Sequence, residues 1–259
     1  MNESAHSTRL VSFVIPTFEE TEITESLDAL TSHLSRLPRD RFEVLVVDDS
    51  AEIYKVAIRR YAESCRQIHG ERIAIRQLDG RHRGKGDAVR IGALAASGAV
   101  VFTMDADLPV PLEHIEEFLS LIDDLGFDIV IGERPLTRNL AEPARYVLSR
   151  ALFAAQRVIV FGSHRFHDTQ CGFKAFRGAV IRELASLQMV SGGMYDVEYL
   201  YAAIRLGASI RRVPVVQNME RRPSKIRVLR ASMTDPIDLL RVRLGGLLGH
   251  YDRAGRGGS

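Results

Sequence analysis

The chain has no tryptophan, only two cysteines and no long apolar run. Cys65 and Cys171 cannot build the disulfide framework of a small secreted domain, which favours a reducing compartment. No segment reaches the roughly 18 uninterrupted apolar residues of a membrane-spanning helix. The polar start, MNESAHSTRL, lacks the apolar centre of a signal peptide. We therefore expect a cytoplasmic protein, and any contact with a membrane to be peripheral.

An excess of one charge is missing as well. The 35 basic and 33 acidic residues leave a net charge of +2, which does not indicate nucleic-acid binding. Lysine is rare, because among the 35 basic residues only those at positions 55, 85, 174 and 225 are lysine. Codon usage is the simplest explanation of the arginine excess. Since lysine is a compact point charge that arginine does not replace, the lysine positions still merit attention.

Strand-like apolar runs alternate with segments of helical period. The expected strands cover residues 9–16, 43–50, 72–78, 99–104, 128–134 and 209–216, and residues 167–176 are expected to form a loop that leads into a further strand. The expected helices cover residues 27–37, 84–98, 115–122, 142–160, 195–207 and 230–248. This order predicts an α/β fold with a mostly parallel central sheet and helices on both faces. We expect one domain over residues 10–250, divided into a nucleotide-binding half (10–135) and an acceptor-side half (136–250), between a flexible N-terminus (1–9) and a disordered tail (251–259).

Polar residues follow four of the predicted strands. They are Pro16–Glu20, Asp48–Asp49, Asp105–Asp107 and Glu133–Arg134. Ligands of parallel sheets bind beyond the carboxyl ends of the strands. Any one of these segments fits an ordinary solvated turn, but four at one edge predict a binding site.

Two aspartates, Asp105 and Asp107, follow the apolar run VVFTM with one residue between them. In an extended chain both side chains point to the same side. Carboxylates placed this way need a positive partner, and Mg²⁺ or Mn²⁺ with substrate phosphates would provide one. A D-x-D triplet alone is a weak signal, and the second acidic pair at Asp48–Asp49 strengthens it.

A phosphate-binding segment is predicted at HRGKGDAVR, where Lys85 stands between two glycines just before a helix. Glycines allow close backbone approach, and a helix N-terminus favours negative charge. The spacing is not that of a P-loop. An ordinary glycine-bounded turn is the alternative.

Together these pieces resemble family 2 glycosyltransferases, which have the GT-A fold. The matching segments are VIPTFEE, VVDDS, GKGDAVRIGA, MDADLP, IVIGER, DTQCGFKAF, YDVEYLYAAIRLG and RRPSKIRVL, in the order of the family and over residues 10 to 245. The later segments most resemble dolichyl-phosphate glucosyltransferases and their polyprenyl-phosphate relatives. The resemblance implies inverting transfer of a hexose, most often glucose, from a UDP-sugar to a polyprenyl phosphate.

The resemblance also implies roles for single residues. Metal binding falls on Asp107, with Asp105. The residues implied in donor binding are Pro16, Phe18, Glu20, Val47, Asp49, Lys85, Asp105, Ala106, Arg134 and Lys225. Asp196 and Asp168 are the catalytic candidates, Asp196 because many members place their general base there.

Other readings of these two acids remain open. If the acceptor is a lipid phosphate, it is already an anion, and Asp196 then only positions sugar hydroxyls. Asp196 is also explained as an acid favoured by a helix N-terminus, and Asp168 as a loop cap. Glu198, two residues further on, should point about 200° away from Asp196 on a helix.

Departures from the family pattern put the acceptor in doubt. Pro109 stands where mannosyl relatives often have a glutamine, which removes one side-chain ligand from the metal. The glucosyl relatives often carry tryptophans near the acceptor, and this chain has none. A soluble small-molecule acceptor is therefore the alternative, while the basic segment 221–243 suits a phosphate group, an anionic membrane surface or a solvated helix face. A sugar nucleotidyltransferase would need an N-terminal glycine-rich loop that is missing here, and a non-enzymatic nucleotide-sugar-binding module is the remaining reading.

Overall fold

The structure is a computed structural model that describes residues 9–38, 41–135, 154, 156–162, 166, 168–217 and 228–252, without the side chains of Arg157 and of residues 228–234. Seven strands form one sheet in the order β3-β2-β1-β4-β6-β5-β7. They are β1 (Leu10–Thr17), β2 (Arg41–Asp48), β3 (Ile73–Asp79), β4 (Val100–Thr103), β5 (Ile129–Glu133), β6 (Lys174–Arg177) and β7 (Ile210–Pro214). The mostly parallel sheet expected from the sequence is confirmed.

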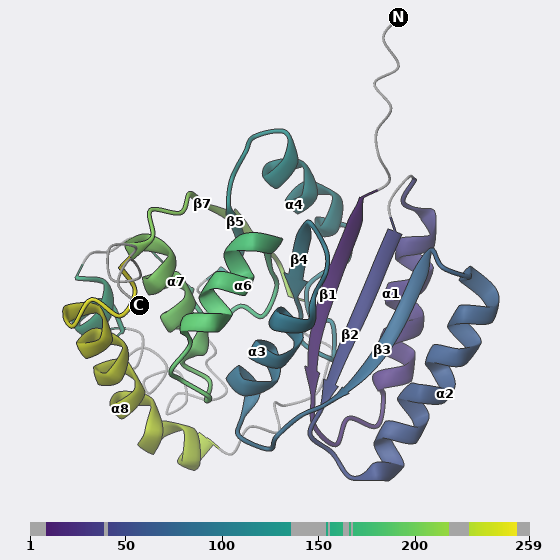
Figure 1. Cartoon of the computed structure of the whole chain (residues 1–259), viewed down its shortest axis with the longest axis horizontal. Coiled ribbons are helices and arrows are strands. Elements are labelled where there is room, and N and C mark those ends of the chain that lie inside the picture. Colours follow the sequence, from purple (N-terminus) through teal and green to yellow (C-terminus); the bar gives the residue numbers. More distant parts are fainter. Residues whose placement is uncertain are drawn as a thin grey trace, which may run out of the picture.

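Helices cover both faces of the sheet (Figure 1). They are α1 (Ile23–Arg36), α2 (Glu52–His69), α3 (Lys85–Ala95), α4 (His114–Asp123), α6 (Gly178–Leu187), α7 (Tyr195–Arg205) and α8 (Val228–Leu247), with a short π-helix η1 (Arg157–Phe161). One core packs α1, α2 and α4 against one face, and a second core packs α3, α6 and α7 against the other. The strand sequences are nearly continuously apolar because both faces of the sheet are buried.

Alternating side chains of β1 show how the sheet divides the two cores. Val11, Phe13 and Ile15 join the core on the α1 side, and Val14 joins the other. The α1 helix contributes Leu27, Leu30 and Leu34 to the core on its side. All three are fully buried, and their spacing places them on one face of the helix. Burying each such leucine stabilises the fold by about 2 kcal/mol.

One strand runs against the others, and this places the second half of the site. β6 is antiparallel to both neighbours, with Lys174 paired to Thr103 at the end of β4 and to Ile131 of β5. The start of β6 therefore lies beside the carboxyl ends of β4 and β5. The loop before β6, residues 168–173, therefore lies at the same edge of the sheet as Asp105.

Two helices and the chain end differ from the sequence expectations. Neither α2 nor α6 was expected, and within α2 only Ile58 and Cys65 are buried. Tyr251 and Asp252 were assigned to a disordered tail, and this was wrong. Tyr251 is fully buried and donates its hydroxyl to Glu198 at 2.8 Å, while Asp252 pairs with Arg205.

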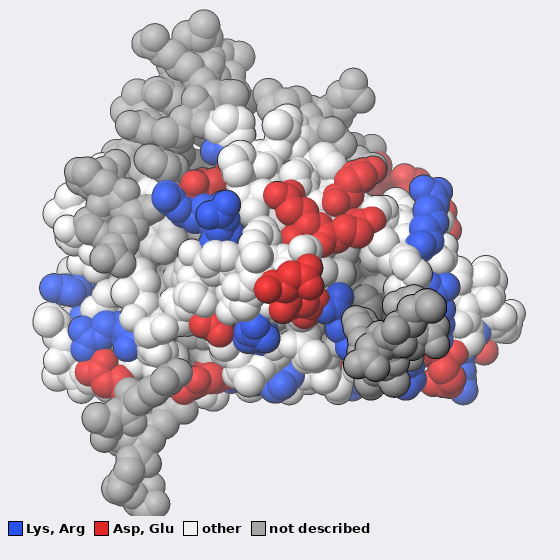
Figure 2. All heavy atoms as spheres, turned by 90° about the horizontal axis from the view of Figure 1, so that it is seen from above, with Lys and Arg blue, Asp and Glu red and all other residues white. Residues whose placement is uncertain are grey.

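The strands β1, β2 and β3 run downward in Figure 1, so their carboxyl ends lie at the lower edge of that view. Figure 2 looks from above onto the opposite side of the molecule, where groups of acidic and basic side chains are interspersed. The α7 helix ends two residues before Gly207, which has a φ of 74°, and this agrees with the helix expected over residues 195–207. Of the predicted helix over 142–160, the structure describes only residues 154 and 156, which are helical, and residues 157–160, which belong to η1.

Candidate active site

The acidic triplet after β4 forms a tight turn rather than an extended segment. The amide of Leu108 donates to the carbonyl of Asp105 at 3.1 Å, and Leu108 has a φ of 44°. The expectation that Asp105 and Asp107 share one side of an extended chain is thus replaced by a turn at the strand end. β4 ends at Thr103, whose hydroxyl donates to the Gly172 carbonyl at 3.0 Å.

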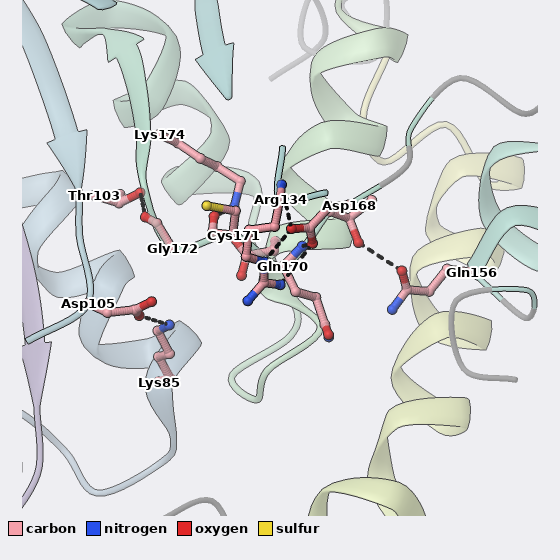
Figure 3. Close-up of polar contacts among 12 residues, drawn as sticks. Lys85, Thr103, Asp105, Arg134, Gln156, Asp168, Gln170, Cys171, Gly172 and Lys174 are labelled. Carbon is pink, nitrogen blue, oxygen red and sulfur yellow. Dashed lines mark hydrogen bonds and ion pairs between the residues drawn. The ribbon is translucent and has the colours of Figure 1, made fainter. Parts of the chain in front are cut away.

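Asp105 forms an ion pair with Lys85, the first residue of α3 (Figure 3). Burial alone would raise the pKa of the Asp105 carboxyl, but Lys85 holds it below its usual range, helped by Lys174 and Arg134. Burial would likewise lower the pKa of Lys85, and the carboxylates of Asp105, Asp196 and Asp107 raise it instead. The opening acid of the triplet therefore has a partner within the protein.

Gly172 makes room for that carboxylate. A Cβ atom at position 172 would lie 2.3 Å from Oδ2 of Asp105. Figure 3 shows the Cys171–Gly172 backbone between the Lys85–Asp105 pair and the Arg134–Asp168 pair. Only glycine at this position lets the loop before β6 close on the acid of β4.

We expect Gly172→Ala to reduce kcat/KM for the donor by about 10- to 100-fold, because a methyl group there must displace the Asp105 carboxylate. Initial rates over a range of donor concentrations measure this, with circular dichroism to show that the fold is retained. A folded variant with wild-type kcat/KM would show that the position of Asp105 is unimportant.

Asp196 lies on α7 and forms a second, deeply buried ion pair. Its Oδ1 atom is 2.5 Å from Nζ of Lys174, and both side chains are at most 5% exposed. Lys174 also donates to the carbonyl of Cys171 at 2.5 Å. Burial raises the pKa of the Asp196 carboxyl, although Lys174 and Lys85 oppose it. Tyr195, the preceding residue, has a fully buried hydroxyl without a hydrogen-bond partner among the described residues.

Glu198 points elsewhere, as its angle on the helix predicts. Its two oxygens accept from the amides of Met189 and Val190 at 2.7 and 2.9 Å, and Oε1 also accepts from the Tyr251 hydroxyl. Glu198 thus ties the end of the chain to the loop before α7. Among the two acids of this helix, Asp196 is the one directed to the site.

Asp168 is held by Arg134 in a two-pronged ion pair (Figure 3). Nε and Nη2 of Arg134 donate to its two oxygens at 2.5 and 2.9 Å, and the amide of Gln170 donates at 3.0 Å. Burial alone would raise the pKa of Asp168, and Arg134 lowers it. A carboxylate so engaged is a poor general base, and it is well placed to fix the guanidinium of Arg134.

Asp107 and Glu20 add further negative charge at the edge. Burial raises the pKa of Asp107, and the carboxylates of Asp105 and Glu20 raise it further. A divalent cation with oxygen ligands would relieve this repulsion, so Asp105 and Asp107 fit such a group by donor type and by charge. Within the described ranges, no three His, Cys, Asp or Glu side chains converge on one point. Phosphate or water oxygens would therefore complete the ligand shell.

The nucleotide end of the predicted site gathers around Asp49. Oδ1 of Asp49 accepts from the amide of His82 at 3.0 Å, and a Cβ atom at Gly80 would lie 1.6 Å from the same oxygen. The half-exposed ring of Phe18 packs on the His82 ring, with centroids 5.1 Å apart. Phe18, Asp49 and His82 thus form one small surface at the ends of β1, β2 and β3.

Other predicted donor residues are distributed unevenly. Pro16 and Val47 are register partners on β1 and β2, but the Val47 side chain is fully buried beneath Gly92 of α3. Ala106 is half-buried against the α1-side core. Lys225 lies outside the described residues.

Sequence reasoning assigned no role to Lys174, Gly172, Gly80 or His82. One signal for Lys174 was available, since it is one of four lysines in a chain that otherwise uses arginine. The roles of Gly172 and Gly80 depend on contacts between distant segments, and no local pattern reports such contacts.

Comparison with known proteins identifies the family. Residues 12–184 match the profile of the family described as Glycosyl transferase family 2. The chain belongs to glycosyl transferase family 2. This protein is therefore a glycosyltransferase, as the motif order indicated.

Curated relatives of this family 2 glycosyltransferase include dolichyl-phosphate beta-glucosyltransferases. The Saccharomyces cerevisiae protein is 28% identical over 256 residues, covering 93% of this chain and 76% of the yeast protein. The Homo sapiens protein is 29% identical over 211 residues, covering 76% of this chain and 63% of the human protein. The chain thus matches these relatives over most of its own length and over part of theirs.

Solved structures confirm the GT-A fold of this glycosyltransferase. Glucosyl-3-phosphoglycerate synthase from Mycobacterium tuberculosis, solved with UDP, aligns with a TM-score of 0.64 at 22% identity, covering 91% of this chain and 80% of that one. A second structure of that enzyme, with Mn²⁺, UDP-glucose and phosphoglyceric acid, aligns at 0.61. No helix in the described part of this chain is both long and apolar enough to cross a bilayer.

Proposed function

We propose that this glycosyltransferase moves a glucosyl group from UDP-glucose to a polyprenyl phosphate with the help of Mg²⁺ or Mn²⁺. The observation that carries the proposal is the pairing of Asp105 with Lys85 beside Asp107, next to the buried Lys174–Asp196 pair. Acidic side chains suited to a cation and lysine side chains suited to phosphate thus lie close together at one edge of the sheet. The dolichyl-phosphate beta-glucosyltransferases among the relatives support the choice of sugar and acceptor.

On the donor side, the surface of Phe18, Asp49 and His82 suits a nucleobase. An exposed aromatic ring can stack on a base. The Asp49 carboxylate still has an oxygen that can accept a hydrogen bond from a base N–H, as Oδ1 already binds the His82 amide. We assign this surface to the uracil ring. We assign Asp105 and Ala106 of the adjacent turn, together with Glu20, to the ribose and diphosphate.

Transfer creates charge on the leaving diphosphate, which these residues stabilise. An oxygen of the acceptor phosphate attacks C1 of glucose, the bond from C1 to the UDP oxygen breaks, and C1 is inverted. Lys85 and Arg134 place positive charge beside the leaving oxygens, where it stabilises the transition state more than the ground state. A cation bound by Asp105 and Asp107 would supply further charge neutralisation there.

Asp196 suits a positioning role toward the sugar better than strong base chemistry. A phosphate acceptor is already an anion and brings its own nucleophilic oxygen, so no proton has to be removed from it. Lys174 donates to Asp196 at 2.5 Å and thereby fixes the carboxylate. The remaining carboxylate oxygen is then suited to accept from a sugar hydroxyl.

A soluble acceptor that carries a phosphate is the second candidate. The structural relative from Mycobacterium tuberculosis was solved with both UDP-glucose and phosphoglyceric acid. The donor chemistry would be unchanged, and the same cationic side chains would receive the acceptor phosphate. The absence of tryptophan from the sequence, which departs from the pattern of the glucosyl relatives, favours this alternative.

A thermal-shift screen of UDP- and GDP-sugars with Mn²⁺ or Mg²⁺ tests the donor. At a ligand concentration about 100-fold above Kd, we expect UDP-glucose with metal to raise Tm by about 5 °C or more. UDP-glucose without metal should give a smaller shift. If no nucleotide gives a metal-dependent shift, the proposed donor chemistry is wrong. Adding polyprenyl phosphate or a water-soluble cell extract to the preferred donor then separates the two acceptors.

A further inference from the structure

The outward face of α8 carries a continuous apolar stripe. Its members are Ile237, Leu240, Leu244, Leu247 and the following residue Leu248, which are 52%, 52%, 55%, 64% and 84% exposed. At 100° per residue these positions occupy an arc of about 100° on a helix. A helix of a soluble domain normally turns such a stripe toward its own core. Here the core takes the opposite side, with Leu239 and Val242 fully buried.

The charged residues around the stripe are distributed in an equally regular way. At 100° per residue, Arg241 and Arg243 lie on its two flanks. The Arg241 side chain is 63% exposed and forms an ion pair with Asp238 at 3.0 Å, and Arg243 donates to the Tyr201 hydroxyl at 3.3 Å. The two acids of this segment, Asp235 and Asp238, are buried on the core side. Among residues 235–250 the outward surface is therefore apolar with basic edges.

This charge pattern distinguishes between two possible binding partners of the apolar stripe, a second copy of the chain and a lipid surface. A second copy of the chain would bring a second pair of arginines to a surface without an exposed acid. Phospholipid headgroups would instead supply phosphates to Arg241 and Arg243, while the acyl region would receive the leucines. Charge complementarity therefore favours a lipid surface.

The α8 helix also lies close to the edge of the sheet that carries the candidate active site. A Cβ atom at Gly192 would be 3.3 Å from Oδ2 of Asp238 on α8. The neighbouring Ser191 carbonyl accepts from the amide of Asp87, two residues after Lys85. One short loop thus separates α8 from the N-terminus of α3. Figure 1 shows the start of α8 at the lower edge, with the carboxyl ends of β1 and β2.

We infer that α8 rests on an anionic phospholipid surface through its apolar stripe, with Arg241 and Arg243 at the headgroups. The helix lies along the surface and holds the site at the level where a lipid-borne phosphate is presented. The inference rests on the proposed function for the acceptor, but the binding surface itself does not require turnover.

Co-sedimentation with vesicles tests this surface without any acceptor lipid. Wild-type protein should sediment with phosphatidylcholine vesicles that contain phosphatidylglycerol, and less with pure phosphatidylcholine. The double variant Leu244→Asp/Leu247→Asp should lose binding by about ten-fold or more, since both side chains leave the apolar phase. The control Ile53→Asp/Ile68→Asp changes two exposed apolar residues of α2 and should bind like wild type.

Several outcomes would overturn the inference. These are wild-type protein that stays in the supernatant, an α8 variant that binds as well as wild type, or a control that loses binding equally. Light scattering adds another: a wild-type dimer that Leu244→Asp/Leu247→Asp converts to a monomer would assign the stripe to a second copy. Metal-dependent stabilisation by UDP-glucose, measured on the same variants, reports separately on the proposed function. It should be unchanged in all of them.

Discussion

Asp107→Ala is expected to lower kcat by about 1,000-fold, the cost typical of removing a group that stabilises charge in the transition state. Burial raises the pKa of Asp107, and the neighbouring carboxylates of Asp105 and Glu20 raise it further. With the alanine, the site loses one of the two carboxylates suited to a cation. Glucose transfer or donor hydrolysis in the presence of Mn²⁺ measures the loss.

The control for this variant is Glu71→Ala, which removes a strongly exposed acid far from the triplet. It should retain wild-type turnover. Asp107→Ala should also lose the metal-dependent part of the thermal shift by UDP while keeping the Tm of the free protein. Full turnover in a folded Asp107→Ala protein would contradict the metal assignment.

The pH dependence of metal-assisted binding follows from the same residue. Because the pKa of Asp107 is raised above the usual 3.8, the carboxylate becomes protonated at a higher pH than an ordinary aspartate. A protonated carboxyl is a poor ligand for a hard cation. Metal-dependent UDP affinity should therefore fall with decreasing pH, beginning above the range in which ordinary aspartates titrate.

The second large effect is expected for Lys174→Met. This change leaves the Asp196 carboxylate buried without its ion-pair partner, which should cost about 3 kcal/mol of the free energy of unfolding. The missing cation also raises the pKa of Asp196 further above its present, already raised value. If the ionised carboxylate is needed, the acid limb of the kcat profile should move to higher pH.

Two companion variants separate positioning from mere stability. Lys174→Met/Asp196→Asn removes both charges and should recover most of the lost stability, but not the activity. Lys55→Met breaks the Lys55–Asp79 pair, which is joined at 2.6 Å and in which the Asp79 side chain is 74% exposed, and should change stability by less than about 1 kcal/mol. If the double variant regains full turnover, or if the acid limb of Lys174→Met does not move, then Lys174 serves only the fold.

Much of the sheet could be predicted because its signals are local. Runs such as Val100–Thr103 are apolar throughout, and the leucines of α1 recur at helical spacing. The α2 helix was missed although its apolar residues recur with a helical period. Most of its surface faces solvent, and only Ile58 and Cys65 are buried. The direction of β6 was also beyond the sequence, since four residues do not report which neighbours they join.

The candidate site divides in the same way. Asp105, Asp107, Lys85 and Asp196 could be predicted as candidates because each belongs to a motif with a recognisable spacing. Their pairing was not expected: the acid of the triplet already has Lys85 as its partner, and Asp196 has Lys174. These pairs join residues separated by 20 and 22 positions, a distance at which no sequence period connects them.

By itself the sequence determined the order of the strands, most of the helices, the family, and the candidate acids together with Lys85, because these depend on residue type and on short spacings. Only the tertiary structure showed which acid pairs with which lysine, why position 172 requires a glycine, and which face of α8 is exposed to solvent. Those results depend on how β6 enters the sheet between β4 and β5 and on which side of each helix the core occupies. Both are settled by packing between segments far apart in the chain.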